Sequence, residues 1–385
     1  MEIKEKIAEK ILTRDFLLIF LAQLTVSTVY CILIPTLPIY LSRIGSTEAE
    51  IGVLIGTLSL SSFVLRPFVG RALLGIWEGT FMITGTVLFT LASVGYLFAF
   101  SFWALLMVRT VQGIGAAFFY TAAVALIAHI SPESRLGQSL SYFYLSFNIP
   151  LVLAPSLGMF LIKSFNFTLL FIVCTGLSSC ALIITGKVGK RKSDPSEKSV
   201  IKDKSFLSRR ALPPAMIAFM ADIIWGALTA FFPLYAVMHG MINPGVFFAA
   251  FAIMTILGRG LGGRVQDLYK RENLILACLA VYITAMGILV LTSSPVMFVV
   301  AAGIWGIGHA FLFPALMAYT LGLTGSSRGP AMGTFTALED LGMGLGPVIM
   351  GIIIRASSYL IMLLCLVLIG IINLSYFYFF VRKRE

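Results

Sequence analysis

The sequence predicts an all-α integral membrane protein in which twelve transmembrane helices form two pseudo-symmetric six-helix bundles. Composition is the first indication, because 59% of the 385 residues are hydrophobic and only 12% are charged. A soluble domain is about a quarter charged, so we expect the apolar excess to face lipid. Regularly spaced apolar segments are the second indication, and an internal repeat is the third.

The apolar segments are long enough to be membrane spans, since a helix needs roughly 20 apolar residues to cross the hydrocarbon core. The first six predicted spans are residues 15–41, 50–73, 80–100, 102–129, 138–163 and 166–186. The second six are residues 213–239, 245–265, 273–293, 295–322, 329–354 and 358–381. Their connections are mostly short, which predicts antiparallel neighbours.

These spans divide the chain into three parts. Residues 1–186 are expected to form the N-terminal bundle, residues 187–212 a cytoplasmic basic linker and residues 213–385 the C-terminal bundle. The linker has two interpretations: a solvated connector attracted to anionic lipid, or a segment that regulates the protein or binds a partner.

The second half of the chain repeats the first at an offset of about 193 residues. Residues 65–71 reappear as 258–264, 112–118 as 305–311, 134–135 as 327–328, 154–155 as 346–347, and 38–40 as 233–235. Two membrane-embedded halves of like topology create a site at their interface, and rocking exposes that site to either side in turn. The repeat therefore predicts a transporter.

Basic residues predict the orientation of the chain. Most Lys and Arg residues fall on the side of the two termini, and the other side offers only Arg43, Lys163 and Arg355. By the positive-inside rule, both termini of a multi-pass plasma-membrane protein would face the cytoplasm. The charged segment Met1–Arg14 precedes an apolar run too long for a signal peptide, so we expect a retained first helix.

Several other functions are disfavoured by the sequence. The five cysteines lie in apolar segments without ligand spacing, which predicts neither a disulfide framework nor a metal site. The basic residues lie between apolar segments rather than on a folded domain, so nucleic acid is not an expected partner. There is no Walker A motif, and the G-x-S-x-G match at residues 325–329 falls between two spans. We therefore expect no enzyme and no cofactor.

The loop after the second span resembles the G-x-x-x-D-R-x-G-R-R/K signature of the major facilitator superfamily, more narrowly of its proton-coupled drug and metabolite exporters. The first copy departs from the signature, with Leu74 in place of the acidic residue, and the second copy is better kept. The resemblance implies a loop that locks the cytoplasmic side, whereas a plain topology signal is the alternative. The gating candidates are Arg66, Gly70, Arg71, Arg259, Gly263, Arg264, Asp267 and Arg271.

Two further signatures carry the resemblance. The fourth span contains Leu105-x3-Arg109-x2-Gln112-Gly113-x-Gly115, which matches the family pattern position by position. The fifth span resembles the antiporter signature G-P-x-x-G, and the eleventh span carries its counterpart. The residues predicted to let these helices bend as hinges are Ala154, Pro155, Gly158, Gly346 and Pro347. The antiporter signature implies export, although small residues also serve plain helix packing.

Ionisable residues at membrane depth are the candidates for proton coupling. They are Asp222, Glu339, Asp340 and Arg109. Charge is costly there, and burial favours the protonated form of a carboxyl group, which suits a proton carrier. The alternatives are a fixed ion pair between Asp222 and Arg109, and a structural role for either Glu339 or Asp340.

The resemblance also implies that the first, fourth, seventh and tenth helices line a substrate cavity. Its candidate residues are Gln23, Tyr30, Gln112, Trp225 and His309. His309 could equally be a hydrogen-bonded packing residue, and the aromatic residues could be packing alone.

The sequence thus predicts a monomeric transporter in the lipid bilayer that exports a small organic molecule or drug in exchange for protons. Proton-coupled uptake of a sugar or small metabolite is one alternative. A membrane sensor that has kept the fold without transporting is the other, and the altered first loop at Leu74 favours it.

Overall fold

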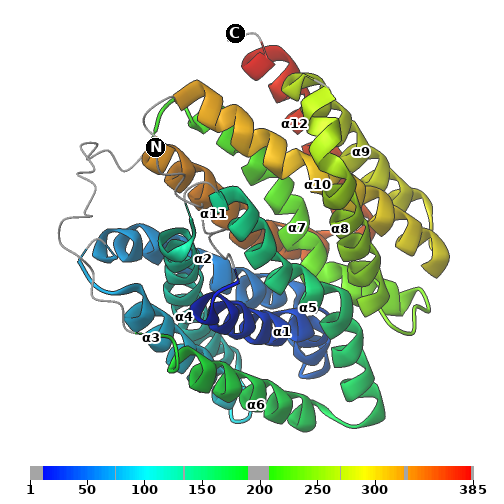
Figure 1. Cartoon of the computed structure of the whole chain (residues 1–385). Coiled ribbons are helices and arrows are strands. Elements are labelled where there is room, and N and C mark those ends of the chain that lie inside the picture. The colour runs from blue at the N-terminus through cyan, green and yellow to red at the C-terminus, as the bar shows by residue number, and fades with distance from the viewer. Residues whose placement is uncertain are drawn as a thin grey trace, which may run out of the picture.

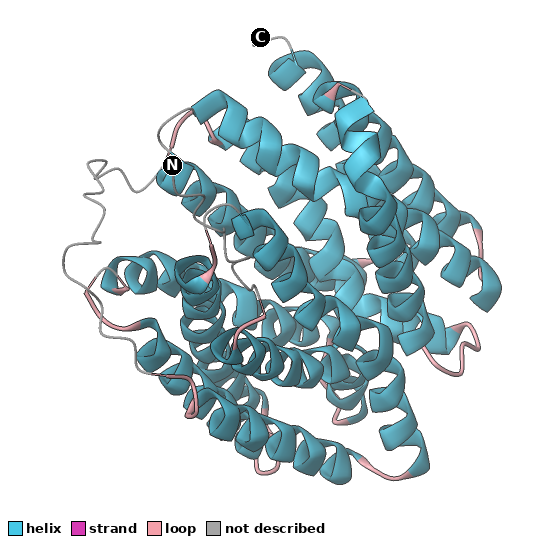
Figure 2. Ribbon diagram, in the orientation of Figure 1, coloured by secondary structure: helices cyan, strands magenta, loops and turns pink. Residues whose placement is uncertain are grey.

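The computed structural model describes residues 12–73, 75–132, 135–189, 208–268, 270–324 and 328–382, and inside these ranges the side chains of residues 136–137, 141, 261–268, 324 and 328–330 are not described. Helices make up nearly all of this part, and it contains no β-strand (Figure 2). The first six helices are α1 (Arg14–Arg43), α2 (Glu48–Ala72), α3 (Glu78–Gly95), α4 (Phe102–Ile130), α5 (Leu136–Ser164) and α6 (Phe167–Thr185). The others are α7 (Leu212–Met238), α8 (Gly245–Leu268), α9 (Arg271–Leu291), α10 (Pro295–Thr324), α11 (Arg328–Ala356) and α12 (Tyr359–Tyr376), followed by the π-helix η3 (Phe377–Val381).

The helix boundaries follow from capping residues. Thr47 forms a capping box with Glu50 at the start of α2, in which each side chain accepts the backbone N–H of the other residue. Ser101, Asn166 and Ser358 cap α4, α6 and α12 through the backbone N–H three residues later. The predicted spans agree with the helices within a few residues.

Most of the helices suit a bilayer. Ten are long and apolar enough to cross a membrane by length and composition, and α3 and α8 are the other two. Large apolar side chains are exposed around the molecule, for example Phe98, Trp103 and Leu291. Because exposed apolar patches of this kind are rare on soluble proteins, these side chains mark the surface that contacts lipid.

The helices form two bundles of six, as Figure 1 shows, with α1–α6 in the lower part of the view and α7–α12 in the upper part. Helices α3 and α6 pack on each other at the outside of the first bundle, and α9 and α12 do so in the second. Between the bundles, α2 packs on α11, α5 on α8 and α1 on α7. The predicted architecture is confirmed, whereas most of the predicted linker (residues 190–207) lies outside the described residues.

The contact between α2 and α11, here called the α2–α11 seam, is closely packed through glycine. A Cβ atom on Gly52 would collide with the carbonyl of Pro347, and one on Gly56 would collide with the carbonyl of Gly344. At the contact between α5 and α8, the α5–α8 seam, a Cβ on Gly245 would collide with the backbone of Pro155. These contacts lie toward the end of the bundles opposite to the termini, so the two bundles are closed at that end.

Candidate functional site

Arg109 lies in α4 and is 5% exposed. Its guanidinium donates hydrogen bonds to the carbonyl of Leu54 (2.9 Å) and the carbonyl of Ile55 (2.9 Å), both in α2, and to Gln112 Oε1 (3.0 Å). No ion pair joins Arg109 to Asp222 in the part of the chain that the structure describes. Carbonyl dipoles therefore stabilise the buried charge, and Arg109 ties α4 to α2 inside one bundle.

Gln112 completes this polar cluster. Its Oε1 also accepts a hydrogen bond of 2.7 Å from the hydroxyl of Tyr96, so this oxygen is already occupied. Gln23, another predicted cavity residue, is 5% exposed, and its Oε1 has no hydrogen-bond partner among the described residues. Buried polar atoms without a partner are rare and point to water or a ligand. Gln112 Nε2 is likewise buried without a partner among the described residues, so each of the two amides has an atom available to bind one.

Asp222 lies in α7 and is 4% exposed. Its Cβ lies against α11, 3.1 Å from where a Cβ on Gly342 would be. Among the described residues it has neither a hydrogen bond nor an ion pair, although it interacts electrostatically with Glu339 and Asp340. A buried carboxylate without a partner is costly, so this group needs a proton or a cationic ligand.

Asp340 and Glu339 have different surroundings. Asp340 Oδ2 lies 2.7 Å from Arg66 Nε across the α2–α11 seam, in a close charge contact that is not a well-aligned hydrogen bond. Arg66 Nε also donates to Ser62 Oγ at 3.2 Å. Glu339 is half-buried and has no hydrogen bond or ion pair within the described ranges. The structure thus brings the three predicted carboxyl groups together, and Asp340 is the one bound to a cation of the opposite bundle.

Aromatic rings surround the predicted cavity residues of the second bundle. Trp225 stacks on His309 with ring centroids 6.2 Å apart, and Phe251 contacts both Trp225 (5.0 Å) and His309 (5.0 Å). His309 Nδ1 lies 2.9 Å from the hydroxyl of Tyr282 in α9. Tyr282 and Phe251 were not predicted as site residues, since an aromatic residue in an apolar span carries no signal of its own in the sequence.

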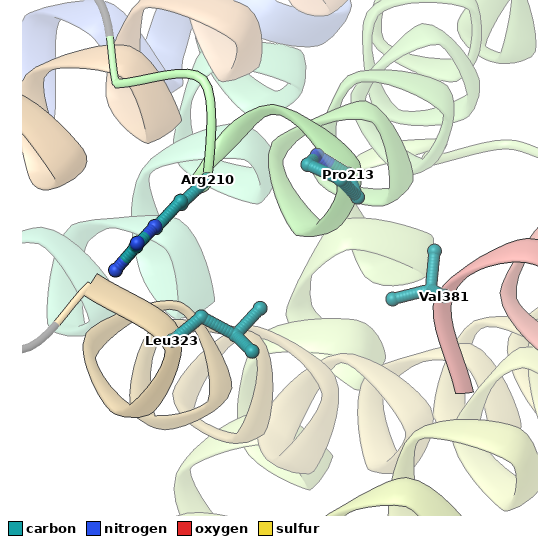
Figure 3. A pocket seen from close by; sticks show the side chains of 4 residues that line it. All are labelled: Arg210, Pro213, Leu323 and Val381. Carbon is teal, nitrogen blue, oxygen red and sulfur yellow. The ribbon is translucent and has the colours of Figure 1, made fainter. Parts of the chain in front are cut away.

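Tyr30 connects the two bundles. Its hydroxyl donates to Met343 Sδ in α11 at 4.0 Å. Tyr30, Arg109 and Thr229 help to line a cavity of about 20 Å³ between α1, α2, α4 and α7, which has room for about one water molecule. A larger cavity of about 230 Å³ lies beside Arg210, Pro213, Leu323 and Val381 (Figure 3). It lies at the end of the second bundle on the side of the termini and includes none of the predicted site residues.

The gating candidates are only partly brought together. Arg66 forms the inter-bundle ion pair, and Arg271 Nη1 donates to the carbonyl of Ala318 at 3.3 Å. Gly70 lies in open surroundings, and Arg71 is exposed. Arg259 is also exposed and interacts electrostatically with Tyr144 of α5. Gly263, Arg264 and Asp267 belong to α8 but their side chains lie outside the described part, as does Leu74.

The predicted hinge residues lie where helices approach closely. Gly158 of α5 faces the carbonyl of Ile32 in α1, and Gly346 of α11 faces the carbonyl of Ile223 in α7. Pro155 and Pro347 face Gly245 and Gly52 across the two seams, and Ala154 is buried. No group of three His, Cys, Asp or Glu side chains among the described residues is arranged to hold a metal ion.

Two membrane-embedded bundles with unpaired charge along their interface define a membrane transporter. Residues 16–242 and 242–385 match the Major Facilitator Superfamily, so the chain belongs to this family of transporters and is not an enzyme.

Two curated relatives come from Staphylococcus aureus. The staphylopine export protein of strain Mu50 is 25% identical over 355 residues, which cover 87% of this chain and 88% of the relative. The quinolone resistance protein NorA of strain MSSA476 is 23% identical over 338 residues, which cover 83% of this chain and 84% of the relative. The crystal structure of the nucleoside transporter NupG has a TM-score of 0.78 at 11% identity, covering 97% of this chain and all (100%) of that one, and shows the fold alone.

Proposed function

We propose that the chain is a secondary active transporter of the plasma membrane that exports a small organic molecule in exchange for protons. Both termini would lie in the cytoplasm, as the distribution of Lys and Arg residues indicates. The two relatives, an export protein and a resistance protein by name, favour export. With this orientation, the closed end of the bundles is the outer end.

The observation that carries the proposal is the isolated carboxyl group of Asp222. It is buried in α7 next to α11 without a hydrogen bond or ion pair among the described residues. Either a proton or a cationic substrate group removes the cost of the isolated charge. Because both neutralise the same carboxyl group, binding of one favours release of the other, which is the requirement for exchange.

The Arg66–Asp340 pair supports a movement that accompanies this exchange. The pair spans the α2–α11 seam, and Asp340 also interacts electrostatically with Asp222 and Glu339. A change of charge at Asp222 or Glu339 therefore alters the electrostatic environment of a contact between the bundles. Arg109 would instead hold α4 against α2, because backbone carbonyls and Gln112 occupy its guanidinium.

Proton-coupled transport in proteoliposomes tests the proposal. The purified full chain is reconstituted with a pH-sensitive dye inside, and proton movement is recorded when tetramethylrhodamine methyl ester is added as the test substrate. We expect substrate and protons to move in opposite directions. Asp222→Asn should reduce the coupled proton flux by about tenfold or more, because an amide carries no proton at this site.

The control variant is Glu272→Gln, which removes a carboxyl group from the first turn of α9, away from the seam. It should retain the proton flux. An Asp222→Asn protein that still exchanges protons for substrate would refute the assignment. Movement of both in the same direction would establish symport, and the absence of any substrate counterflow would favour the non-transporting sensor.

A further inference from the structure

Arg259 of α8 is a cation that has no carboxylate partner among the residues that the structure describes. The 193-residue offset makes it the counterpart of Arg66 in α2, and it is exposed whereas Arg66 is paired with Asp340. Arg259 interacts electrostatically with Tyr144 and Tyr282, and His309 also lies within the range of its charge. No ion pair to Arg259 is present in the described ranges.

The opposite helix explains why Arg259 differs from Arg66. The Ala-Pro motif of α5 and the Gly-Pro motif of α11 are 192 residues apart, so Asn148 of α5 is the counterpart of Asp340. Asn148 is buried (8% exposed) and neutral. Its amide has almost the same shape as the carboxyl group of Asp340 but cannot neutralise a guanidinium. Within the described ranges, the α5–α8 seam therefore lacks the carboxylate that the α2–α11 seam has at this position.

Arg259 lies at the depth of the unpaired acids. Asp222, Glu339 and Arg259 are each 9 to 11 residues from the ends of their helices on the side of the termini, or about 13–17 Å at 1.5 Å per residue. Tyr282 interacts electrostatically with both Asp222 and Arg259, so both charges lie within electrostatic range of this tyrosine. They form no ion pair with each other in the described structure.

Tyr282, which interacts electrostatically with both charges, belongs to a group of aromatic side chains. Tyr282 binds His309 through its hydroxyl, and His309 lies between the rings of Trp225 (6.2 Å) and Phe313 (4.6 Å). Flat rings prefer offset-stacked or edge-to-face contacts with other rings, so this wall suits a planar apolar body. A substrate with such a body would present one charged end to Asp222 and the other to Arg259.

We propose that the transported molecule is amphoteric, with a cationic group that binds at Asp222 and a carboxylate that binds Arg259. This inference rests on the proposed function and specifies the class of its substrate. A purely cationic molecule would leave Arg259 without a partner, and a purely anionic one would leave Asp222 without a partner. The amphoteric molecule neutralises both groups, and its carboxylate meets a guanidinium that can bind it through two parallel hydrogen bonds.

The test is equilibrium binding of three dyes of one shape to the purified full chain in nanodiscs, followed by fluorescence anisotropy. Tetramethylrhodamine carries a cationic ring system and a carboxylate, its methyl ester retains only the cation, and fluorescein retains the carboxylate without a cationic nitrogen. We expect tetramethylrhodamine to bind about tenfold more tightly than its ester, as one charge-assisted contact provides. Fluorescein should bind more weakly than tetramethylrhodamine by a similar factor.

Arg259→Gln should bring the affinity for tetramethylrhodamine down to that for the ester and leave the ester unchanged. Asn148→Asp should also lower the affinity for tetramethylrhodamine to that for the ester, because the new carboxylate would pair with Arg259. Arg259→Lys should retain part of the preference for tetramethylrhodamine over its ester. Arg271→Gln, which removes a cation at the first residue of α9, should retain all of this preference. Asp222→Asn should weaken both cationic dyes equally.

Three results would overturn the inference: equal affinity of the wild-type chain for the acid and the ester, no binding of any of the dyes, or a preference that survives Arg259→Gln. Thermal unfolding shows whether the Arg259→Gln and Asn148→Asp proteins are folded. If they are not, the affinities of the wild-type chain for tetramethylrhodamine and its ester test the inference by themselves. The binding assay needs no proton gradient. A chain that exchanges protons but shows no preference for the acid would keep the proposed function and lose this substrate class.

Discussion

The two seams between the bundles occupy equivalent places in the repeat, yet they are built differently. The α2–α11 seam has Gly52 and Gly56 on one side and Gly344 on the other, so backbone meets backbone. In the α5–α8 seam the counterparts of Gly56 and Gly344 are Ala249 and Val152. Gly245 of this seam still meets the backbone of Pro155. Because side chains rather than bare backbone lie at the positions of Ala249 and Val152, we expect this seam to yield more easily during transport.

The two seams also differ in their charged side chains. The α2–α11 seam neutralises its own guanidinium through Asp340, whereas in the α5–α8 seam the counterpart of Asp340 is the neutral Asn148. The repeat therefore supplies two copies of one framework, of which one holds the bundles together and the other is available to a ligand. Three experiments with variants test this difference, from the largest expected effect to the smallest.

Gly56→Leu should have the largest effect, because its side chain would enter the backbone of α11 at Gly344 and contact Val348. Overpacking of this kind costs about 1–3 kcal/mol, which shifts an equilibrium between two states by about 5–150-fold. We expect the closed state of the outer end to be depleted and transport to fall accordingly. Spin-label distances between Glu48 and Ile352 at that end would measure the depletion. Gly176→Leu is the control, since a Cβ at Gly176 meets nothing within 4 Å. If the distance is unchanged in Gly56→Leu, the α2–α11 seam is not closely packed in the membrane.

Neutralising the Arg66–Asp340 pair should have an intermediate effect. The Arg66 side chain is 31% exposed, so solvent screens the pair and its coupling energy should be about 1 kcal/mol or less. Arg66→Gln, Asp340→Asn and the double variant should all widen the distance between spin labels at Phe68 and Gly333 to a similar extent.

The similarity of the single and double variants is the informative result, because a shared contact can be lost only once. Arg355→Gln, on the opposite side of the bilayer by the predicted topology, should leave the distance unchanged. Additive effects of the two single variants would show that Arg66 and Asp340 act independently.

Asn148→Asp should have the smallest structural effect, since Arg259 is exposed and a new pair there would be weak. The new pair would give the α5–α8 seam an ion pair like that of the α2–α11 seam. It should favour the state in which both seams are closed by about two- to fivefold. Spin labels at Tyr142 and Leu257 would detect the shorter distance. Asn148→Gln, which stays neutral, provides the control, and a distance that both variants change equally would indicate a packing effect instead of an ion pair.

The sequence alone predicted most of the fold, for a physical reason that applies to every helix here. A backbone in lipid must satisfy its hydrogen bonds within the helix, so spans are recognisable from long apolar stretches without knowledge of their neighbours. The largest difference is at α3, which ends at Gly95 instead of residue 100, because Ser101 caps the next helix and the residues between form a turn.

The candidate site was predicted as a set of residue types, and its contacts were not. Buried charges at Arg109 and Asp222 are visible in the sequence because charge within an apolar span is costly. That Arg109 binds backbone carbonyls of α2 was not visible, since any exposed carbonyl can accept and the sequence does not say which helix lies beside it. Tyr282 and Phe251 were missed for the same reason.

The sequence by itself determined that this chain is a two-bundle membrane transporter and which ionisable groups lie at membrane depth. Hydrophobicity, repeat spacing and charge position are local properties that one chain records directly. Only the tertiary structure decided that Arg66 is paired, that Asp222 and Arg259 form no ion pair within the described part of the chain, and that the bundles are closed at one end. These properties depend on distances between helices far apart in the sequence, which are set by packing across the seams.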